Sequence, residues 1–165
     1  MEAQNLINEY IKRARDAQAI FEKKSQEEVD KAVKVIARVI VDNAVMLAEF
    51  AVNETGMGNV TDKISKHTNK PKLILNHLIG KKSRGILERD ETTGITLVAK
   101  PMGVVGAITP TTNPVVTSMS NSMFSLKCGN SIILAPHPRA KGCSGMAAEL
   151  MRGELKKIGL PEDLI

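Results

Sequence analysis

Aromatic residues and cysteines are scarce in this chain of 165 residues. It contains no tryptophan, one tyrosine, three phenylalanines and two cysteines, Cys128 and Cys143. Two cysteines are too few for a disulfide framework, and none of the three histidines stands at metal-ligand spacing from them. The composition therefore indicates a reducing compartment, for which we expect the cytoplasm, and it predicts no metal site.

Long apolar runs and the common phosphate-binding glycine motifs are also absent. No run approaches the roughly 18 residues that a membrane span needs. The start of the chain lacks the basic and continuous apolar regions of a secretory signal. The chain has neither a G-x-G-x-x-G nor a G-x-x-x-x-G-K-[ST] sequence. We therefore expect no membrane partner, and a nucleotide site would have to use other loops.

Charge is unevenly distributed along the chain. There are 23 basic and 18 acidic residues, for a net charge of +5, and residues 61–89 alone hold eight basic and two acidic ones. Such a stretch can face solvent, nucleic acid, an acidic partner or a phosphate-rich cofactor. No aromatic ring lies within it to stack on single-stranded bases. We therefore interpret it as a solvated face, with a basic nucleic-acid-binding module as the alternative.

Residues 1–80 have the apolar periodicity of helices. Apolar side chains from Leu6 to Phe21 recur at three- and four-residue steps, which predicts an amphipathic helix. Because no flexible linker follows it, we interpret this helix as part of the core and not as a targeting tag. Ser25 and Glu28 form a capping-box pair that begins a second helix.

Two further helices are expected in this part of the chain. The third covers about residues 44–53 and ends near Gly56, which can adopt the left-handed conformation of a helix stop. The fourth covers about residues 61–79. Within it, Pro71 is expected to start a new helix or to kink the existing one, with Asn69 as the cap of the restart.

The periodicity changes in the second half. Residues 83–89 and 95–100 flank a turn-rich connector and predict a β-hairpin. Beyond it, two short apolar runs predict buried strands, and each is followed by a helical pattern: strands at 104–108 and 131–135, helices at about 115–127 and 140–158. Strand, helix, strand, helix is the order of a parallel α/β sheet with right-handed crossovers.

These patterns predict an α/β protein. N-terminal helices (1–80) are followed by a β-hairpin (81–100) and by the first part of a Rossmann-like parallel sheet (101–165). Two parallel strands leave open edges and uncovered apolar faces. We therefore expect an incomplete dinucleotide-binding domain that belongs to a larger enzyme.

Two loops stand where an open parallel sheet binds its ligands, at the carboxyl ends of the strands. They are Thr109–Pro114 and Pro136–Lys141, and a helix follows each. The first turn of a helix has free N–H donors for an anion. Arg139 and Lys141 add two cations to the second loop. The arrangement indicates a phosphate or nucleotide site, and ordinary turn chemistry with solvated charges is the alternative.

Neither cysteine is a convincing nucleophile. Cys128 follows the end of a helix and is expected to be buried or half-buried. Cys143 stands in the first turn of a helix near Lys141, a position that favours the thiolate. No histidine accompanies it at a suggestive spacing. We therefore expect both thiols to be structural.

The two loops also carry a resemblance to a known family. Residues 101–114 (PMGVVGAITPTTNP) resemble the P-x-G-V-x-x-x-I-x-P-x-x-N-P segment of the aldehyde dehydrogenase superfamily. Residues 131–141 (SIILAPHPRAK) match the H-P-R-A-K signature of its coenzyme A-acylating branch, which includes the aldehyde dehydrogenase half of bifunctional aldehyde–alcohol dehydrogenases. Residues 54–63 and 159–163 are similar to further landmarks, so the resemblance covers essentially the whole chain.

This resemblance implies an oxidoreductase. In the family a cysteine attacks a short-chain aldehyde, hydride passes to NAD or NADP, and coenzyme A takes the acyl group from the thioester. The family's cysteine lies downstream of the matched region, so we expect the 165-residue chain alone to be inactive. The hairpin would belong to the oligomerisation element, which implies a homo-oligomer, and a bacterial microcompartment is an alternative location. A non-catalytic oligomerisation fragment is the alternative function.

The resemblance also implies site residues. Hydrolytic relatives place an oxyanion-donating asparagine at the position of Thr112, and Asn113 follows one residue later, so both are candidate donors. After the second strand, hydrolytic relatives bind the adenosine ribose with a lysine that this chain lacks, which leaves NAD against NADP open. Lys141 is a further candidate for that role. The cofactor-binding candidates are Thr109, Pro110, Thr111, Thr112, Ala135, Pro136, His137, Pro138 and Arg139.

Overall fold

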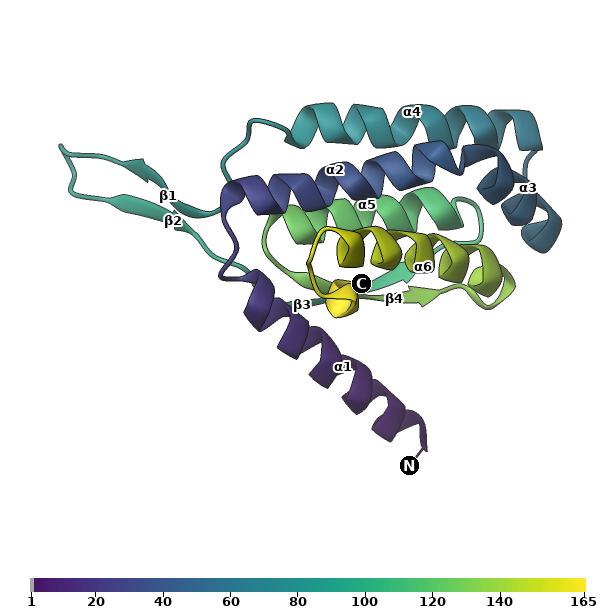
Figure 1. Cartoon of the computed structure of the whole chain (residues 1–165), viewed down its shortest axis with the longest axis horizontal. Helices are drawn as coiled ribbons and strands as arrows, with labels where there is room; N and C mark the ends of the chain where they lie inside the picture. The colour runs from purple at the N-terminus through teal and green to yellow at the C-terminus, as the bar shows by residue number, and fades with distance from the viewer. Residues whose placement is uncertain (1) are drawn as a thin grey trace.

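The structure, a computed structural model, describes residues 2–165 and has the predicted α/β architecture. Its elements are, in chain order, α1 (Glu2–Phe21), α2 (Gln26–Asp42), α3 (Ala44–Thr55), α4 (Val60–Leu78), β1 (Gly85–Arg89), β2 (Thr96–Ala99), β3 (Val104–Thr109), α5 (Pro114–Lys127), β4 (Ser131–Pro136), the 3-10 turn η1 (Pro138–Ala140), α6 (Lys141–Lys157) and a second 3-10 turn η2 (Glu162–Leu164). Strands β3 and β4 form a parallel sheet, and β1 and β2 form a separate antiparallel one (Figure 1). Among residues 2–165, no helix is long and apolar enough to cross a membrane.

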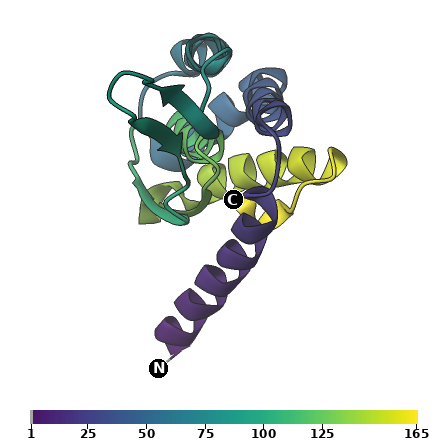
Figure 2. The same cartoon turned by 90° about the vertical axis from the view of Figure 1, so that its left-hand side faces the viewer.

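Helix α1 is buried along only part of its length. Ala14, Ala17 and Phe21 pack into the core, whereas Leu6 and Ile7 are exposed. The end of the helix lies against β3 and β4, and its beginning runs away from the rest of the molecule in two perpendicular views (Figures 1 and 2). The end of α1 therefore belongs to the hydrophobic core, and its first turns contribute little to it.

The next two helices begin and end at the predicted signals. The hydroxyl of Ser25 accepts a hydrogen bond from the N–H of Glu28, whose carboxylate accepts one from the N–H of Ser25, so the capping box is present. Gly56 ends α3 with a φ of 67°, which a residue without a Cβ adopts at no steric cost. Both boundaries follow from local chemistry.

Helix α4 runs without interruption through Pro71, so the expected restart at this residue is wrong. Asn69 does not act as a cap, because its amide donates to the hydroxyl of Ser65 within the helix, at 3.2 Å. The cap is Asn59, whose side-chain oxygen accepts from the N–H of Asp62. Pro71 is buried where α4 packs on α2, α3 and α5, and this tertiary packing offsets the missing backbone hydrogen bond.

The parallel sheet has one covered face and one open face. Side chains alternate between the two faces of a strand, and in β3 Ala107 and Thr109 are buried while Ile108 is 87% exposed. Helix α5 covers the buried face, and α6 lies beside it. The expected burial of residues 104–108 is therefore wrong for Ile108, which points to the opposite side.

The hydrophobic core lies between this sheet and the helices. Its largest fully buried side chains are Phe21, Ile36, Ile40, Leu47, Met119, Met123, Leu126, Ile132, Met151 and Leu155. Met46, Phe124 and Met146 are apolar but exposed. Each lies beside the stripe that contacts neighbouring elements, which in α6 consists of Cys143, Ala147, Met151 and Leu155.

The predicted hairpin projects from the body of the molecule (Figure 1). Its base is held by a polar network. The N–H of Ser83 donates to the side-chain oxygen of Gln26, at 2.8 Å, and its hydroxyl donates to the carbonyl of Lys127, at 2.6 Å. The buried ammonium of Lys127 in turn forms an ion pair with the carboxylate of Asp30. The hairpin is thus tied to α2 and α5 at its base, while its strands are almost entirely exposed.

Candidate functional site

The two candidate loops lie side by side at one edge of the parallel sheet. Thr109 pairs with Pro136 at the carboxyl ends of β3 and β4, and the N–H of His137 donates to the carbonyl of Thr109 at 3.1 Å. The sequence predicted this juxtaposition from strand order alone. It is the position at which open parallel sheets bind ligands.

The first loop is held by two lysines of α4. Lys63 Nζ donates to the carbonyl oxygen of Thr112 at 3.2 Å, and Lys66 Nζ donates to Oδ1 of Asn113 at 2.7 Å. Sequence reasoning placed both lysines on a solvated face and missed these contacts. Their spacing of three residues, on one face of a helix, was the available signal.

Lys63 is unusual because its side chain is buried, with only 5% of the residue exposed. Burial lowers the pKa of its ammonium, the charge of Lys66 lowers it further, and Cys143 opposes the change. A buried ammonium needs hydrogen-bond partners. The carbonyl of Thr112 is such a partner, so the loop and the lysine stabilise each other.

Asn113 is the N-cap residue of α5 by position but not by side-chain chemistry. Its side chain makes no capping hydrogen bond. The amide oxygen accepts from Lys66. Among residues 2–165, the amide nitrogen has one hydrogen-bond contact, with the hydroxyl of Thr112 at 3.5 Å. A separation of 3.5 Å is at the outer limit for a hydrogen bond. The NH₂ group of Asn113 is therefore a weakly engaged donor at the sheet edge.

The second loop is tied to the end of α3. The guanidinium of Arg139 donates to the carbonyl of Thr55 at 3.0 Å, and the N–H of Arg139 donates to Nδ1 of His137 at 3.1 Å. Arg139, expected to face a cofactor, thus uses some of its hydrogen-bond donors in contacts within the protein. His137 caps the turn η1, which carries the chain into α6.

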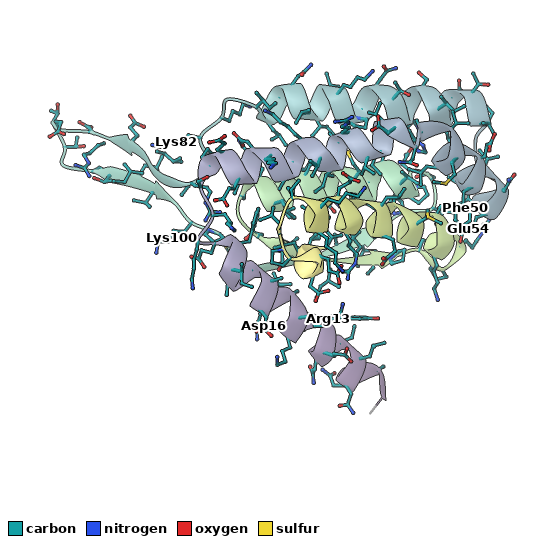
Figure 3. The ribbon with its side chains drawn as sticks, in the orientation of Figure 1. Arg13, Asp16, Phe50, Glu54, Lys82 and Lys100 are labelled. Atoms are coloured by element: carbon teal, nitrogen blue, oxygen red, sulfur yellow. The ribbon has the colours of Figure 1, made fainter. Side chains whose placement is uncertain are left out.

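The first turn of α6 is already occupied by a carboxylate. The N–H groups of Gly142 and Cys143 both donate to Glu54, each at 2.7 Å. Figure 3 shows Glu54 and its neighbour Phe50 on α3, beside this end of α6. A Cβ at position 142 would lie 2.7 Å from the Phe50 ring and 2.9 Å from the Glu54 carboxylate, so only glycine allows this approach. The expectation that these donors are free for an anionic ligand is therefore wrong.

One hollow of the molecule lies away from these loops. A hollow of about 320 Å³ lies between α1, β4 and α6, with Tyr10, Arg13, Arg152 and Ile165 among its lining residues. None of the candidate site residues lines it. The residues predicted for the site thus lie at the strand ends and not in this hollow.

Comparison with known proteins identifies the family of the chain. Residues 2–165 match the model of the aldehyde dehydrogenase family. The chain belongs to this family. It is 49% identical over 159 residues to the succinate-semialdehyde dehydrogenase (acetylating) of Clostridium kluyveri. The matched region covers 96% of this chain and 35% of that protein.

Solved structures of the family superimpose on the chain. An acetylating aldehyde dehydrogenase from Geobacillus thermoglucosidasius matches with a TM-score of 0.94 and 37% identity, over 98% of this chain and 36% of that one. A propionaldehyde dehydrogenase from Rhodopseudomonas palustris with bound propionyl-CoA matches with a TM-score of 0.81 and 34% identity, over 95% of this chain and 34% of that one. The chain thus spans about a third of the length of these relatives.

The thiols of this aldehyde dehydrogenase chain differ from expectation. Burial and, to a smaller extent, the nearby Glu54 carboxylate together raise the pKa of the Cys143 thiol to about 12. The favoured thiolate expected for this position is therefore wrong, because the thiol is buried and a carboxylate lies beside it. Cys128, expected to be at least half-buried, is exposed because it is the C-cap of α5.

Thiol reactivity tests both assignments. With an excess of an aromatic disulfide reagent at pH 8, we expect one fast-reacting thiol per 165-residue chain, that of Cys128, because only a thiolate attacks a disulfide. Cys143 should react only when the chain unfolds. Cys128→Ser should remove the fast phase, whereas a fast phase that survives in this variant would contradict the burial of Cys143.

Glu54 makes stability depend on pH. Burial raises the pKa of its carboxyl, but the hydrogen bonds from Cys143 and Gly142 outweigh this effect and leave the pKa below its ordinary value of 4.5. A lowered pKa in the folded state stabilises the protein above the ordinary value, and this stabilisation is lost as the pH falls through the folded-state pKa.

We expect Glu54→Gln to lower the free energy of unfolding at pH 7 by about 1 kcal/mol, as for the loss of a charged helix cap. The difference from the unsubstituted protein should shrink below about pH 4.5, as the carboxyl becomes protonated. Chemical denaturation at several pH values measures this. Glu49→Gln, an exposed change on the same helix, is the control; an equal loss there would refute the capping role.

Proposed function

We propose that this chain supplies part of the active site of a coenzyme A-acylating aldehyde dehydrogenase, which oxidises a short-chain aldehyde to an acyl-CoA with NAD or NADP. The observation that carries the proposal is the meeting of the two strand-end loops at one sheet edge. It is supported by relatives whose names describe acetylating dehydrogenases and by a related structure with bound propionyl-CoA.

The first loop is proposed to stabilise the oxyanion. When a thiolate adds to an aldehyde, negative charge develops on the carbonyl oxygen, and a fixed N–H donor stabilises it. The NH₂ group of Asn113 has only a weak contact, to the hydroxyl of Thr112, and is available as a donor. The carbonyl of Thr112 accepts from Lys63 and cannot donate to an oxyanion. We assign the donor role to Asn113. The attacking cysteine is proposed to come from outside these 165 residues.

The second loop is proposed to hold the cofactor together with the first. Residues 135–139 face the strand-end edge next to Thr109, and their backbone and His137 offer polar groups for a nucleotide. When bound, NAD or NADP supplies the hydride acceptor. Because Glu54 occupies the donors of α6, the phosphates of the cofactor must use other groups, and the start of α5, where Asn113 makes no capping bond, is the nearest set.

The hairpin is proposed to act in homo-oligomer assembly. Ile86, Leu87, Leu97 and Val98 are large apolar side chains, and all four are exposed on it. Exposed apolar strands pair readily with another chain. We place the assembled protein in the cytoplasm or in a bacterial microcompartment, and light scattering of the protein with and without Leu97→Lys would test the assembly role.

Initial rates test the proposed reaction. The polypeptide that carries this chain is incubated with NAD or NADP and with acetaldehyde, propionaldehyde, succinate semialdehyde or sulfoacetaldehyde, and formation of reduced cofactor is followed. We expect rates that depend on added coenzyme A. Rates that are unchanged without coenzyme A would favour a hydrolytic enzyme, and salt-sensitive binding to DNA without turnover would favour the nucleic-acid alternative.

A further inference from the structure

The ammonium of Lys66 contacts the one side chain that is proposed to donate to the oxyanion. Lys66 and Lys63 lie one turn apart on the same face of α4. Lys63 holds the backbone of the loop through Thr112, and Lys66 holds the amide of Asn113 itself, at 2.7 Å. The proposed reaction uses neither ammonium, so their role lies in what they do to the loop.

The two ends of an asparagine amide have opposite chemistry. Its oxygen only accepts hydrogen bonds and its NH₂ group only donates them, and a half-turn about the last side-chain torsion exchanges the two. An ammonium only donates. Lys66 therefore selects the orientation in which the oxygen of Asn113 faces α4 and the NH₂ group faces away from it.

We propose that Lys66 is a positioning residue that holds the amide of Asn113 in the orientation in which it donates to the oxyanion. The inference rests on the proposed function, since an oxyanion forms only if the chain serves an aldehyde dehydrogenase. Lys63 holds the neighbouring backbone of the same loop. Its buried ammonium fixes the carbonyl of Thr112, so the backbone that carries Asn113 cannot swing away.

Three substitutions at position 66 separate orientation from bulk and charge. Lys66→Arg keeps a donor-only cation, and kcat should stay within about threefold. Lys66→Met removes the hydrogen bond and lets the amide turn, so we expect kcat to fall about tenfold. Lys66→Glu places an acceptor beside Asn113 and draws the NH₂ group toward α4, so kcat should fall about 10²–10³-fold, as for loss of the donor.

The test is a double-mutant cycle in the polypeptide that carries this chain. We expect KM for NAD and for coenzyme A to change less than about twofold, because Lys66 acts on the transition state and not on binding. In an Asn113→Ala background, Lys66→Glu should cause no further loss of kcat. Lys70→Glu, a charge reversal at an exposed position one turn along α4, is the matched control and should leave kcat unchanged.

The outcomes distinguish this inference from the proposed function. Equal losses of kcat for Lys66→Glu with and without Asn113 would overturn the positioning role and leave the function intact. If the unsubstituted protein shows no turnover that depends on coenzyme A, the proposed function fails instead. The midpoints of thermal unfolding of Lys66→Met, Asn113→Ala and the double variant then test the hydrogen bond between the two side chains. Non-additive changes in the midpoint support the proposal that Lys66 holds Asn113, and additive changes overturn it.

Discussion

A polypeptide of residues 1–165 is expected to oxidise no aldehyde. With acetaldehyde, coenzyme A and NAD or NADP, the absorbance of reduced cofactor should stay at the level of the blank. The reaction needs a thiolate within about 3–3.5 Å of the aldehyde carbon. The thiol of Cys143 is buried, with its pKa raised to about 12. Cys128 is exposed but precedes the start of β4, whereas the candidate loops lie at the carboxyl ends of β3 and β4.

The length of β4 places the Cys128 thiol too far from the candidate loops to act there. Six residues of a strand span about 20 Å, far beyond the reach of a thiolate that must touch an aldehyde at the other end. The control is the longer polypeptide that carries this chain, which should turn over under the same conditions. Turnover by residues 1–165 above that of a Cys143→Ser variant would contradict both the assignment of Cys143 as structural and the placement of the nucleophile elsewhere.

Replacing Asn113 with alanine in the longer polypeptide should lower kcat about 10²–10³-fold, the usual effect of losing one oxyanion donor. The NH₂ group of Asn113 has only a weak contact in the fold and is therefore available to the reaction. Thr112→Val should change kcat less than about threefold. The hydrogen bond from Lys63 to Thr112 is accepted by the backbone carbonyl, which the substitution keeps. Steady-state rates at saturating aldehyde measure both effects.

These two neighbouring variants control for each other. Both alter the same loop, so a general disturbance of the loop would lower kcat in both. The reverse ranking, with Thr112→Val severe and Asn113→Ala mild, would assign the donor role to Thr112 and remove the basis for a positioning role of Lys66. Unfolding midpoints of the two variants show whether either loses activity through instability.

Local chemistry explains which parts of the fold the sequence could predict. The Ser25 capping box, the Gly56 helix stop and the order of β3, α5, β4 and α6 each depend on residues that are close in the chain. The juxtaposition of the two loops follows from the same order, because the carboxyl ends of parallel strands meet at one edge. The candidate site could therefore be located before its contacts were known.

The contacts that the sequence did not predict join residues that are far apart. Glu54 reaches the first turn of α6 across 88 positions, and Lys66 reaches Asn113 across 47. The charge pattern predicted a solvated face for Lys66, and the position of the second loop before a helix predicted donors free for an external anion. Pro71 was expected to interrupt α4, but packing with its neighbours outweighs that local preference. In each case tertiary structure decides what a local pattern leaves open.

The most direct test of the account is the identity of the product made by the longer polypeptide from propionaldehyde, NAD or NADP, and coenzyme A. We expect mass spectrometry to find propionyl-CoA, in amounts equal to the reduced cofactor that is formed. Free propionate in equal amounts, with coenzyme A unconsumed, would contradict the proposal that these strand-end loops serve an acylating aldehyde dehydrogenase.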